Sequence, residues 1–297
     1  MLVLAGATAS GKTQLAIELA RRFNAEIVGA DSRQIYRGMP IGTAAPTAAQ
    51  RTAVPHHLID FLDPQQRYSA AQFSHDAIEC ISDIHARGKH AIVTGGTGFY
   101  IRALAGDVAL APPGDAGLRQ RLSVEARLHE PDFLHQWLAV REPARAASIA
   151  PTDRYRVMRS LEVSLMQTPS STALSRASLS DVGIPFAKIF IDVDDATLEK
   201  RIAARVDAML ADGLIEEAER IGPQAVAASA VGYLQALAYV RGWQTFDELR
   251  RGIIRATRRY AKRQRTWFRS EPQTIWVRSN NPLSDVEKLA REKLGWA

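Results

Sequence analysis

The sequence predicts an α/β fold, an open and mostly parallel β-sheet flanked by helices, that carries a helical insertion subdomain. Short apolar runs alternate along the chain with longer segments of helical periodicity, a pattern typical of parallel strands joined by helices. Residues 111–185 interrupt this alternation, because they contain helical patterns and no clear strand. A connection of that length is too long for a plain loop, which predicts an inserted subdomain.

The predicted strands are short and apolar, as strands buried on both faces of a parallel sheet should be. They are Met1–Ala5, Glu26–Ala30, Ala91–Thr94, Lys188–Val193 and Thr274–Val277. Because open parallel sheets bind their ligands at the carboxyl ends of the strands, we expect the functional site at that edge.

The predicted helices fall into a core set and an insertion set. The core helices are Thr13–Phe23, Ala70–Arg87, Thr197–Ile221, Phe246–Arg269 and Pro282–Leu294. The insertion helices are Leu118–His129, Pro131–Val140 and Asp153–Met166. The insertion opens with the turn-forming Pro112-Pro113-Gly114 and closes with the Ser/Thr-rich segment Thr168–Ser180. We therefore expect a core domain at 1–110 and 186–297 and an insertion at 111–185.

The composition is that of an ordinary globular protein, with 46% apolar and 24% charged residues among 297. The single cysteine, Cys80, excludes an internal disulfide and a zinc site built on several thiolates. No apolar run approaches the ~18 residues of a membrane helix. The first residues, Met1–Gly6, are typical of a strand and not of a signal peptide, so we expect a cytoplasmic protein without a membrane partner.

A phosphate-binding loop follows the first strand. The segment 6–13 fits the pattern G-x-x-x-x-G-K-[ST] and opens a helix, the context that this motif requires. The backbone N–H groups and the helix N-terminus favour bound phosphate, Lys12 is expected to neutralise its oxygens, and Thr13 to ligate Mg²⁺. The motif makes the predicted fold P-loop NTPase-like. The expected phosphate-binding residues are Gly6, Thr8, Ala9, Ser10, Gly11, Lys12 and Thr13.

The loop indicates phosphate binding without indicating ATP hydrolysis, which also requires an acid that holds Mg²⁺ through water. The strand Ala91–Thr94 runs into Gly95-Gly96-Thr97-Gly98 without an acid. Asp192 does end a strand, but a strand-end turn explains it equally well. Asp31 follows the second strand beside the loop, where it either takes a proton or holds Mg²⁺, or caps the next turn. These patterns leave the alternatives open.

Together these segments resemble the bacterial type of the tRNA dimethylallyltransferase (tRNA isopentenyltransferase) family. Two blocks make the resemblance specific, Asp31-Ser32-Arg33-Gln34-Ile35-Tyr36-Arg37-Gly38 and Ala261-Lys262-Arg263-Gln264. The resemblance implies transfer of a dimethylallyl group from dimethylallyl diphosphate to N6 of the adenosine on the 3′ side of the anticodon, which gives N6-isopentenyladenosine and diphosphate. It further implies Mg²⁺ as the cofactor, with Asp31, Thr13 and Arg205 as catalytic residues and with Arg201 beside Arg205 on the donor.

The resemblance also implies how the tRNA anticodon stem-loop is held, with no obligate protein partner and no need for more than a monomer. The target base has to leave its stack to reach the sheet edge, as it does in other base-modifying enzymes. Tyr155 stands where the family often has glutamine, so that a stacking contact is expected there. The implied tRNA-binding residues are Asp31, Ser32, Arg33, Gln34, Thr97, Arg119, Tyr155, Arg156, Arg159, Lys262 and Arg263.

Other interpretations remain open at this stage. A small-molecule kinase that binds ATP, with the insertion as a lid, and a non-catalytic RNA-binding ATPase both fit the phosphate loop. Without the resemblance, a solvated helix face that pairs with Glu199 or Asp207 is the preferred interpretation of Arg201 and Arg205. His56 and His57 are adjacent and lack a third ligand nearby, which favours packing or loop roles over metal binding.

The basic charge of the chain is concentrated in one stretch. The net charge is +6, and residues 241–269 contain ten basic and two acidic residues, so that this stretch is +8 and the rest of the chain is −2. A solvated helix is the simpler explanation, but so one-sided a charge favours contact with an RNA backbone.

Overall fold

The computed structural model describes residues 1–108, 110, 112, 114–166, 178–279 and 281–297. The chain divides into two compact units, Met1–Val108 with Arg176–Ala297, and Ala109–Ser175. The smaller unit therefore ends at Ser175, earlier in the chain than the boundary expected at 185. Pro113 and the first ten residues of the Thr168–Ser180 segment lie outside the described residues.

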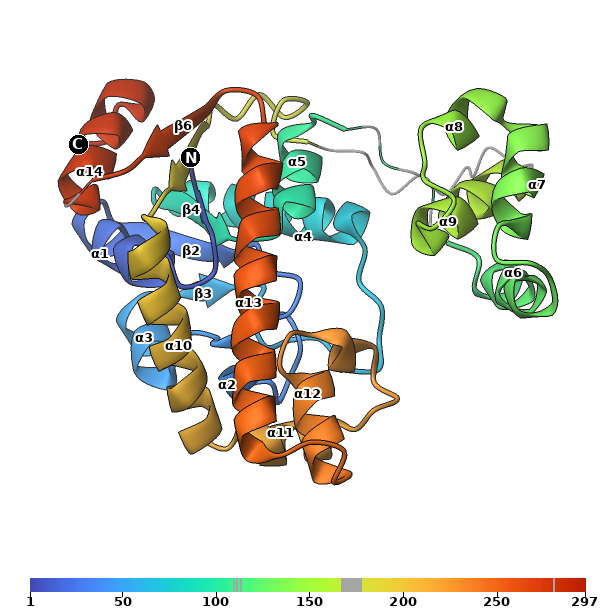
Figure 1. Cartoon of the computed structure of the whole chain (residues 1–297). Coiled ribbons are helices and arrows are strands. Elements are labelled where there is room, and N and C mark those ends of the chain that lie inside the picture. The colour runs from blue at the N-terminus through green and yellow to red at the C-terminus, as the bar shows by residue number, and fades with distance from the viewer. Residues whose placement is uncertain (109, 111, 113, 167–177, 280) are drawn as a thin grey trace. The chain divides into compact units, whose positions relative to one another are not determined.

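The larger unit is built on a six-stranded sheet of order β3-β2-β4-β1-β5-β6, in which each pair of neighbours is parallel (Figure 1). The predicted α/β fold with a parallel sheet is thus confirmed. The strands are β1 (Leu2–Gly6), β2 (Ala25–Gly29), β3 (His56–His57), β4 (His90–Gly95), β5 (Ala187–Ile191) and β6 (Thr274–Val277). The sequence analysis missed β3, because two polar residues carry no strand pattern.

The strand register brings three loops to one edge of the sheet. Leu4 of β1 and Gly29 of β2 both lie opposite Thr94 of β4. The carboxyl ends of these neighbouring strands are therefore level. The phosphate loop, the segment after β2 and the segment after β4 meet there, where a ligand site is expected in such a sheet.

One face of the sheet packs against α1 (Lys12–Arg22) and α14 (Pro282–Leu294). Leu4, Ile92 and Ile189 of the sheet form a buried cluster with Leu15 of α1 and Trp296, which follows α14. Burial of each side chain of this size contributes roughly 1.5–3 kcal/mol to folding.

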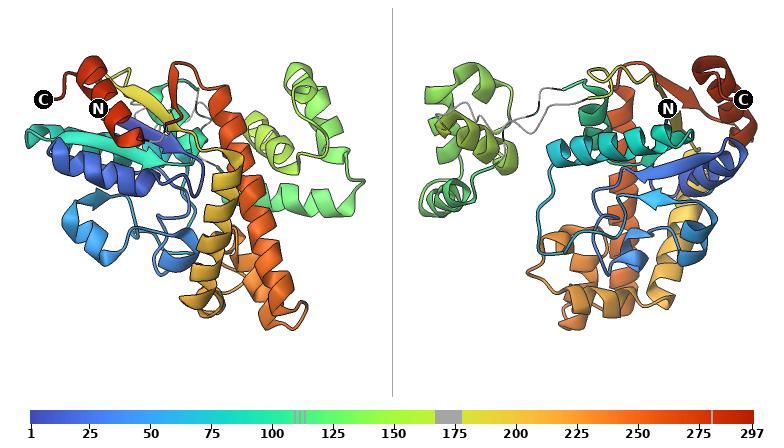
Figure 2. Two further views of the ribbon diagram at one scale, coloured as in Figure 1. Left: turned by 60° about the vertical axis from the view of Figure 1, so that its left-hand side comes forward. Right: turned by 180° about the vertical axis from the view of Figure 1, so that it is seen from behind.

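The other face packs against α4 (Ala70–Ala86), which in turn contacts α5 (Gly98–Ala105). Phe268 of α13 (Phe246–Arg269) packs on Phe190 of β5, with 5.0 Å between the ring centroids. Beside α13 lies α10, and both panels of Figure 2 show further views of this unit. The remaining elements are α2 (Pro40–Thr43), α3 (Ala48–Ala53), α10 (Asp195–Ala211), α11 (Leu214–Ile221), η1 (Val226–Ser229) and α12 (Tyr233–Val240).

The prediction of one helix over Thr197–Ile221 was wrong. The chain turns between α10 and α11, where Gly213 adopts a left-handed φ of +101°. The apolar pattern continues across this turn, which is why periodicity alone merged the two helices.

The smaller unit is helical and has its own core. Its helices are α6 (Ala116–Leu128), α7 (Phe133–Arg141), α8 (Pro143–Ala147) and α9 (Arg154–Leu165), drawn in green in Figure 1. Asp115 and Asp153 cap the N-termini of α6 and α9. Leu122, Leu138 and Leu161 are among its buried core residues. Among all the residues described, no helix has both the length and the hydropathy that crossing a membrane requires.

Candidate active site

The phosphate loop is a tight turn between β1 and α1. Ser10 donates its backbone N–H to the carbonyl of Ala7 at 3.1 Å, and Gly11 has a left-handed φ of +92° just before α1 begins. A side chain at Gly11 would strain this conformation. The hydroxyl of Ser10 is buried without a hydrogen-bond partner in the described chain. A buried orphan hydroxyl at this position fits a ligand oxygen.

Two cations and one carboxylate face one another beside the loop. Burial lowers the pKa of Lys12 to about 8, Asp31 opposes this shift, and Arg205 adds to it. Burial also lowers the pKa of Arg205, again against the effect of Asp31. Groups perturbed by burial and by specific neighbours are typical of sites that receive a charged ligand.

A small cavity lies at the strand ends beside Lys12 and Asp31. Thr13, Gln34 and His56 line it as well. The phosphate loop and the segment after β2 therefore open into one space, as the sequence predicted from their positions at the sheet edge.

Asp31 caps the next turn, one of the roles that the sequence left open. Its Oδ1 accepts the backbone N–H of Arg33 at 2.9 Å, which caps the next turn. This bond uses one of its two carboxylate oxygens, and the residue still lines the cavity.

Thr97, after β4, supports the segment after β2. Its hydroxyl accepts the backbone N–H of Ser32 at 2.9 Å and lies 3.3 Å from the Ser32 hydroxyl. The side chain of Tyr260 in α13 also hydrogen-bonds to Thr97, and burial raises the pKa of this phenol, helped by Asp31. Tyr260 was not predicted as a site residue.

The amide of Gln34 is held in one orientation. Its Nε2 donates to the carbonyls of Thr43 at 3.2 Å and Ala44 at 3.1 Å. Because both partners are acceptors, Nε2 faces them, and the side-chain oxygen takes part in neither bond. Gln34 also lines the cavity. Arg205 donates to the same Thr43 carbonyl at 3.4 Å.

Arg201 and Arg205 of α10 both reach toward the loops. Arg201 donates to the Ser10 carbonyl at 3.1 Å. The alternative pairing with Glu199 or Asp207 is wrong, because Glu199 pairs with Arg258 and Asp207 with Arg250 of α13.

The acid at the end of β5 has a structural role. Asp192 is 9% exposed and pairs with Arg265 and Arg278. Thr94 occupies the corresponding end of β4, next to β1. Neither strand end offers a free carboxylate to a metal ion.

Gln264 was missed as a site residue with a role of its own, although it lies in a block that carried the resemblance. Its Oε1 accepts the backbone N–H of Thr8 and its Nε2 donates to the carbonyl of Gly96 at 2.9 Å, both in buried bonds. A signal existed in the sequence, because Gln264 is a polar residue in phase with Ala261 and Phe268 on the buried face of α13.

The adjacent histidines differ in their surroundings. His57 lies 2.8 Å from the buried carboxylate of Glu26, in agreement with a packing role. His56 uses Nδ1 for the Val54 carbonyl at 2.7 Å, and its Nε2 is buried without a partner in the described chain. It lines the cavity, which the sequence analysis did not predict.

In the smaller unit, the predicted tRNA-binding residues fall into two groups. Arg119 and Arg159 pair with the buried carboxylate of Glu162 at 2.8 and 2.7 Å, and so join α6 to α9. Although burial works against its charged form, these two guanidiniums hold the pKa of Glu162 below its ordinary value. Tyr155 is 76% exposed and the Arg156 side chain is 64% exposed, so these two are accessible.

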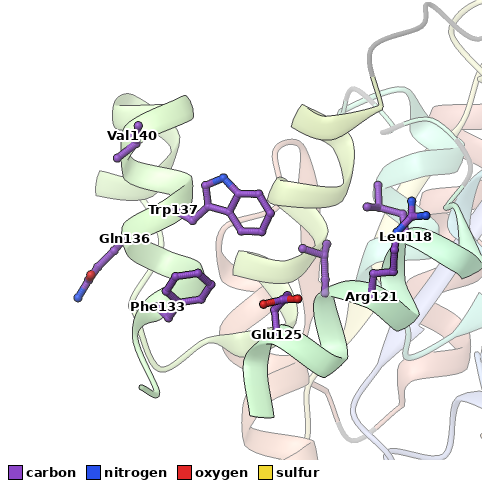
Figure 3. Close-up of a pocket in the computed structure, with 8 residues that line it drawn as sticks. Leu118, Arg121, Glu125, Phe133, Gln136, Trp137 and Val140 are labelled. Atoms are coloured by element: carbon purple, nitrogen blue, oxygen red, sulfur yellow. The ribbon is translucent and has the colours of Figure 1, made fainter. Parts of the chain in front are cut away.

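The smaller unit also has an apolar groove between α6 and α7 (Figure 3). Phe133 and Trp137 line it from α7, and Leu118 and Arg121 line it from α6. None of the tRNA-binding residues predicted from the sequence lines this groove.

Part of the positive charge of α13 is neutralised within the protein. Arg250, Arg258 and Arg265 pair with acids outside the helix. Lys262 and Arg263 are exposed, and the Arg263 guanidinium lies 5.7 Å from the ring centroid of Tyr260. Lys262 and Arg263, which lie within one helical turn of Tyr260, are therefore among the accessible basic residues of α13.

The chain is similar to known proteins over most of its length. The chain matches the family model of IPP transferase over residues 34–271. The tRNA dimethylallyltransferase of Anaeromyxobacter dehalogenans (strain 2CP-C) is 45% identical over 296 residues, which cover 98% of each chain. The tRNA dimethylallyltransferase of Geobacter sulfurreducens is 40% identical over 301 residues, 99% of this chain and 97% of that protein.

Solved structures show the same fold. The full-length tRNA isopentenylpyrophosphate transferase of Bacillus halodurans aligns with a TM-score of 0.71 and 34% identity, over 99% of this chain and 96% of the other. A eukaryotic dimethylallyltransferase that acts on tRNA aligns with a TM-score of 0.78 and 25% identity, over 98% of this chain and 78% of the other. This chain therefore belongs to the IPP transferase family.

Proposed function

We propose that this enzyme modifies tRNA, by transferring the dimethylallyl group of dimethylallyl diphosphate to N6 of the adenosine on the 3′ side of the anticodon. The family and its relatives support a tRNA-prenylating transferase. The observation that carries the assignment is that Lys12, Asp31 and Arg205 lie together at the phosphate loop. This arrangement holds an anion beside a base.

The chemistry needs both functions. The N6 amine is a poor nucleophile, because its lone pair is delocalised into the adenine ring. Asp31 accepts the N6 proton as nitrogen bonds to the allylic carbon and the carbon–oxygen bond to diphosphate breaks. Lys12, Arg205 and Arg201 stabilise the negative charge that develops on the departing diphosphate.

The residues present also fit Mg²⁺. Thr13 lines the cavity, and its hydroxyl is an oxygen ligand of the kind that this ion prefers. The unpartnered hydroxyl of Ser10 fits a phosphate oxygen in the same loop. When bound, the ion would add positive charge at the diphosphate. Thr13 would hold it.

The acceptor side is formed by the segment after β2. The fixed acceptor oxygen of Gln34 suits an exocyclic amine, which donates hydrogen bonds. Ser32, Arg33 and Thr97 lie next to it and are assigned to the nucleotides around the target. Tyr155 and Arg156 in the smaller unit, with Lys262 and Arg263 in α13, are assigned to the rest of the stem-loop.

The proposal is tested with purified protein, radiolabelled dimethylallyl diphosphate and an unmodified anticodon stem-loop. We expect label in N6-isopentenyladenosine after digestion, with one diphosphate released per transfer. A stem-loop with guanosine at the target position is the matched control and should remain unlabelled. Absence of transfer, together with ATP-dependent phosphorylation of a small molecule, would favour the kinase interpretation instead.

A further inference from the structure

A buried carboxylate outside the site is joined to it through a four-residue turn. Glu217 of α11 is 1% exposed, and the partners that its oxygens have among the described residues are neutral. Its oxygens accept the backbone N–H groups of Ile41 at 3.0 Å and Gly42 at 2.8 Å, and the hydroxyl of Tyr233 at 2.6 Å. Three hydrogen bonds compensate the burial of this charge.

These bonds fix the turn α2 against α11 and α12. Tyr233 is fully buried, and a Cβ at Gly42 would lie 2.5 Å from its ring, so the turn and the ring are in close contact. Within the turn, the Thr43 hydroxyl donates to the Met39 carbonyl at 2.6 Å. The position of α2 is therefore defined on both sides.

The other end of this turn carries the acceptors for the site. The carbonyls of Thr43 and Ala44 both accept from the Gln34 amide nitrogen, and the Thr43 carbonyl also accepts from Arg205. A displacement of α2 would release the Gln34 amide to rotate and would remove a contact of Arg205.

We propose that Glu217 is a positioning residue, which holds α2 so that Gln34 presents its side-chain oxygen to the target adenosine. Tyr233 shares this role through its hydrogen bond to Glu217. The inference rests on the proposed function, since it takes the adenosine as the partner of Gln34. Precise placement of such supporting groups commonly decides how well a site binds its substrate.

The test compares Glu217→Gln with Glu219→Gln, an exposed residue on the same helix. Glutamine keeps the volume but presents one acceptor and one donor, so one N–H of the turn loses its partner. We expect Glu217→Gln to raise KM for the anticodon stem-loop about tenfold and to change KM for the donor less than about twofold. Glu219→Gln should change neither KM value. A purely structural defect would lower kcat and leave both KM values unchanged, which would overturn the inference.

A double-mutant cycle with Gln34→Ala tests the path of the effect. If Glu217 acts through Gln34, Glu217→Gln should change the stem-loop KM less than about threefold in the Gln34→Ala background. Additive effects would refute the proposed path. Tyr233→Phe keeps the ring and the two backbone hydrogen bonds to Glu217, and it is the test if Glu217→Gln does not fold. A raised KM for the stem-loop in Tyr233→Phe would support the inference, and an unchanged KM would overturn it.

The wild-type reaction separates the two proposals. A wild-type protein that transfers no prenyl group refutes the proposed function and the inference with it. An active wild-type protein whose Glu217→Gln variant behaves like Glu219→Gln refutes the positioning role alone.

Discussion

The side-chain oxygen of Gln264 accepts the backbone N–H of Thr8 at 2.8 Å, across 256 positions of the chain. With its second bond, to the Gly96 carbonyl, this residue of α13 ties the phosphate loop to the loop after β4. The two loops follow neighbouring strands, so one side chain bridges the two walls of the candidate site.

Replacement of Gln264 with methionine should destabilise the protein and weaken donor binding. Methionine has a similar shape but leaves a buried N–H and a buried carbonyl unpaired, at about 1–3 kcal/mol each. Denaturant unfolding measures the stability, and calorimetry with inorganic diphosphate measures the binding. Thr266→Met, at an exposed position two residues along the same helix, is the control. Equal stability of the two variants would show that the bridge contributes little.

Asp31→Asn should abolish most of the turnover while the donor still binds. The amide can still accept the Arg33 N–H, so the turn is kept, but it is too weak a base for the N6 proton. General-base catalysis is typically responsible for ~10²–10⁴-fold in rate, and we expect a loss in that range. Single-turnover transfer and diphosphate affinity are the two measurements.

Asp63→Asn is a matched control for this substitution. Asp63 accepts the backbone N–H of Gln65 at 2.8 Å, in the same turn geometry as Asp31, but on an exposed loop. Its rate should equal that of the wild type. Unchanged turnover in Asp31→Asn would remove Asp31 from the role of base.

The sequence placed the loops of the candidate site correctly where each is a contiguous motif at a strand end. The phosphate loop and Asp31 could be placed because parallel strands bring their carboxyl ends together. Gln264 and Glu217 act through contacts with distant segments, which a linear pattern does not reveal. Both are polar residues at apolar positions of their helices, Gln264 between Ala261 and Phe268 and Glu217 between Leu214 and Ala218. That mismatch was the available signal.

Acid should destabilise the smaller unit through Glu162. The guanidiniums of Arg119 and Arg159 hold the pKa of Glu162 below the ordinary value of 4.5, despite burial. A carboxyl with a lowered folded-state pKa stabilises the fold fully above its unfolded pKa, and this contribution is lost as the pH falls through the folded-state value. Hydrogen exchange in α6 and α9 should therefore accelerate below about pH 4.5, once corrected for the intrinsic rate.

Glu162→Gln should remove this acid dependence and lower stability at pH 7 by about 1.5–3 kcal/mol, because a neutral amide replaces the buried carboxylate that two partly buried guanidiniums share. Glu125→Gln, on the exposed side of α6, should leave both properties unchanged. The same acid response in wild type and Glu162→Gln would assign it to another group.

Affinity for the stem-loop should fall steeply with salt, and Lys262 and Arg263 should contribute to that slope. Each exposed cation that contacts a phosphate releases counterions, so its removal reduces the slope of log affinity against log salt by about 1. We expect Lys262→Ala with Arg263→Ala to flatten the slope by about twice that amount. Arg258→Ala is the control, because Arg258 already pairs with Glu199. Filter binding between 50 and 200 mM salt, the range in which such effects are large, measures the slopes. Equal flattening by Arg258→Ala would mean that the charge of α13 acts as a whole and that these two residues make no contact of their own with the RNA.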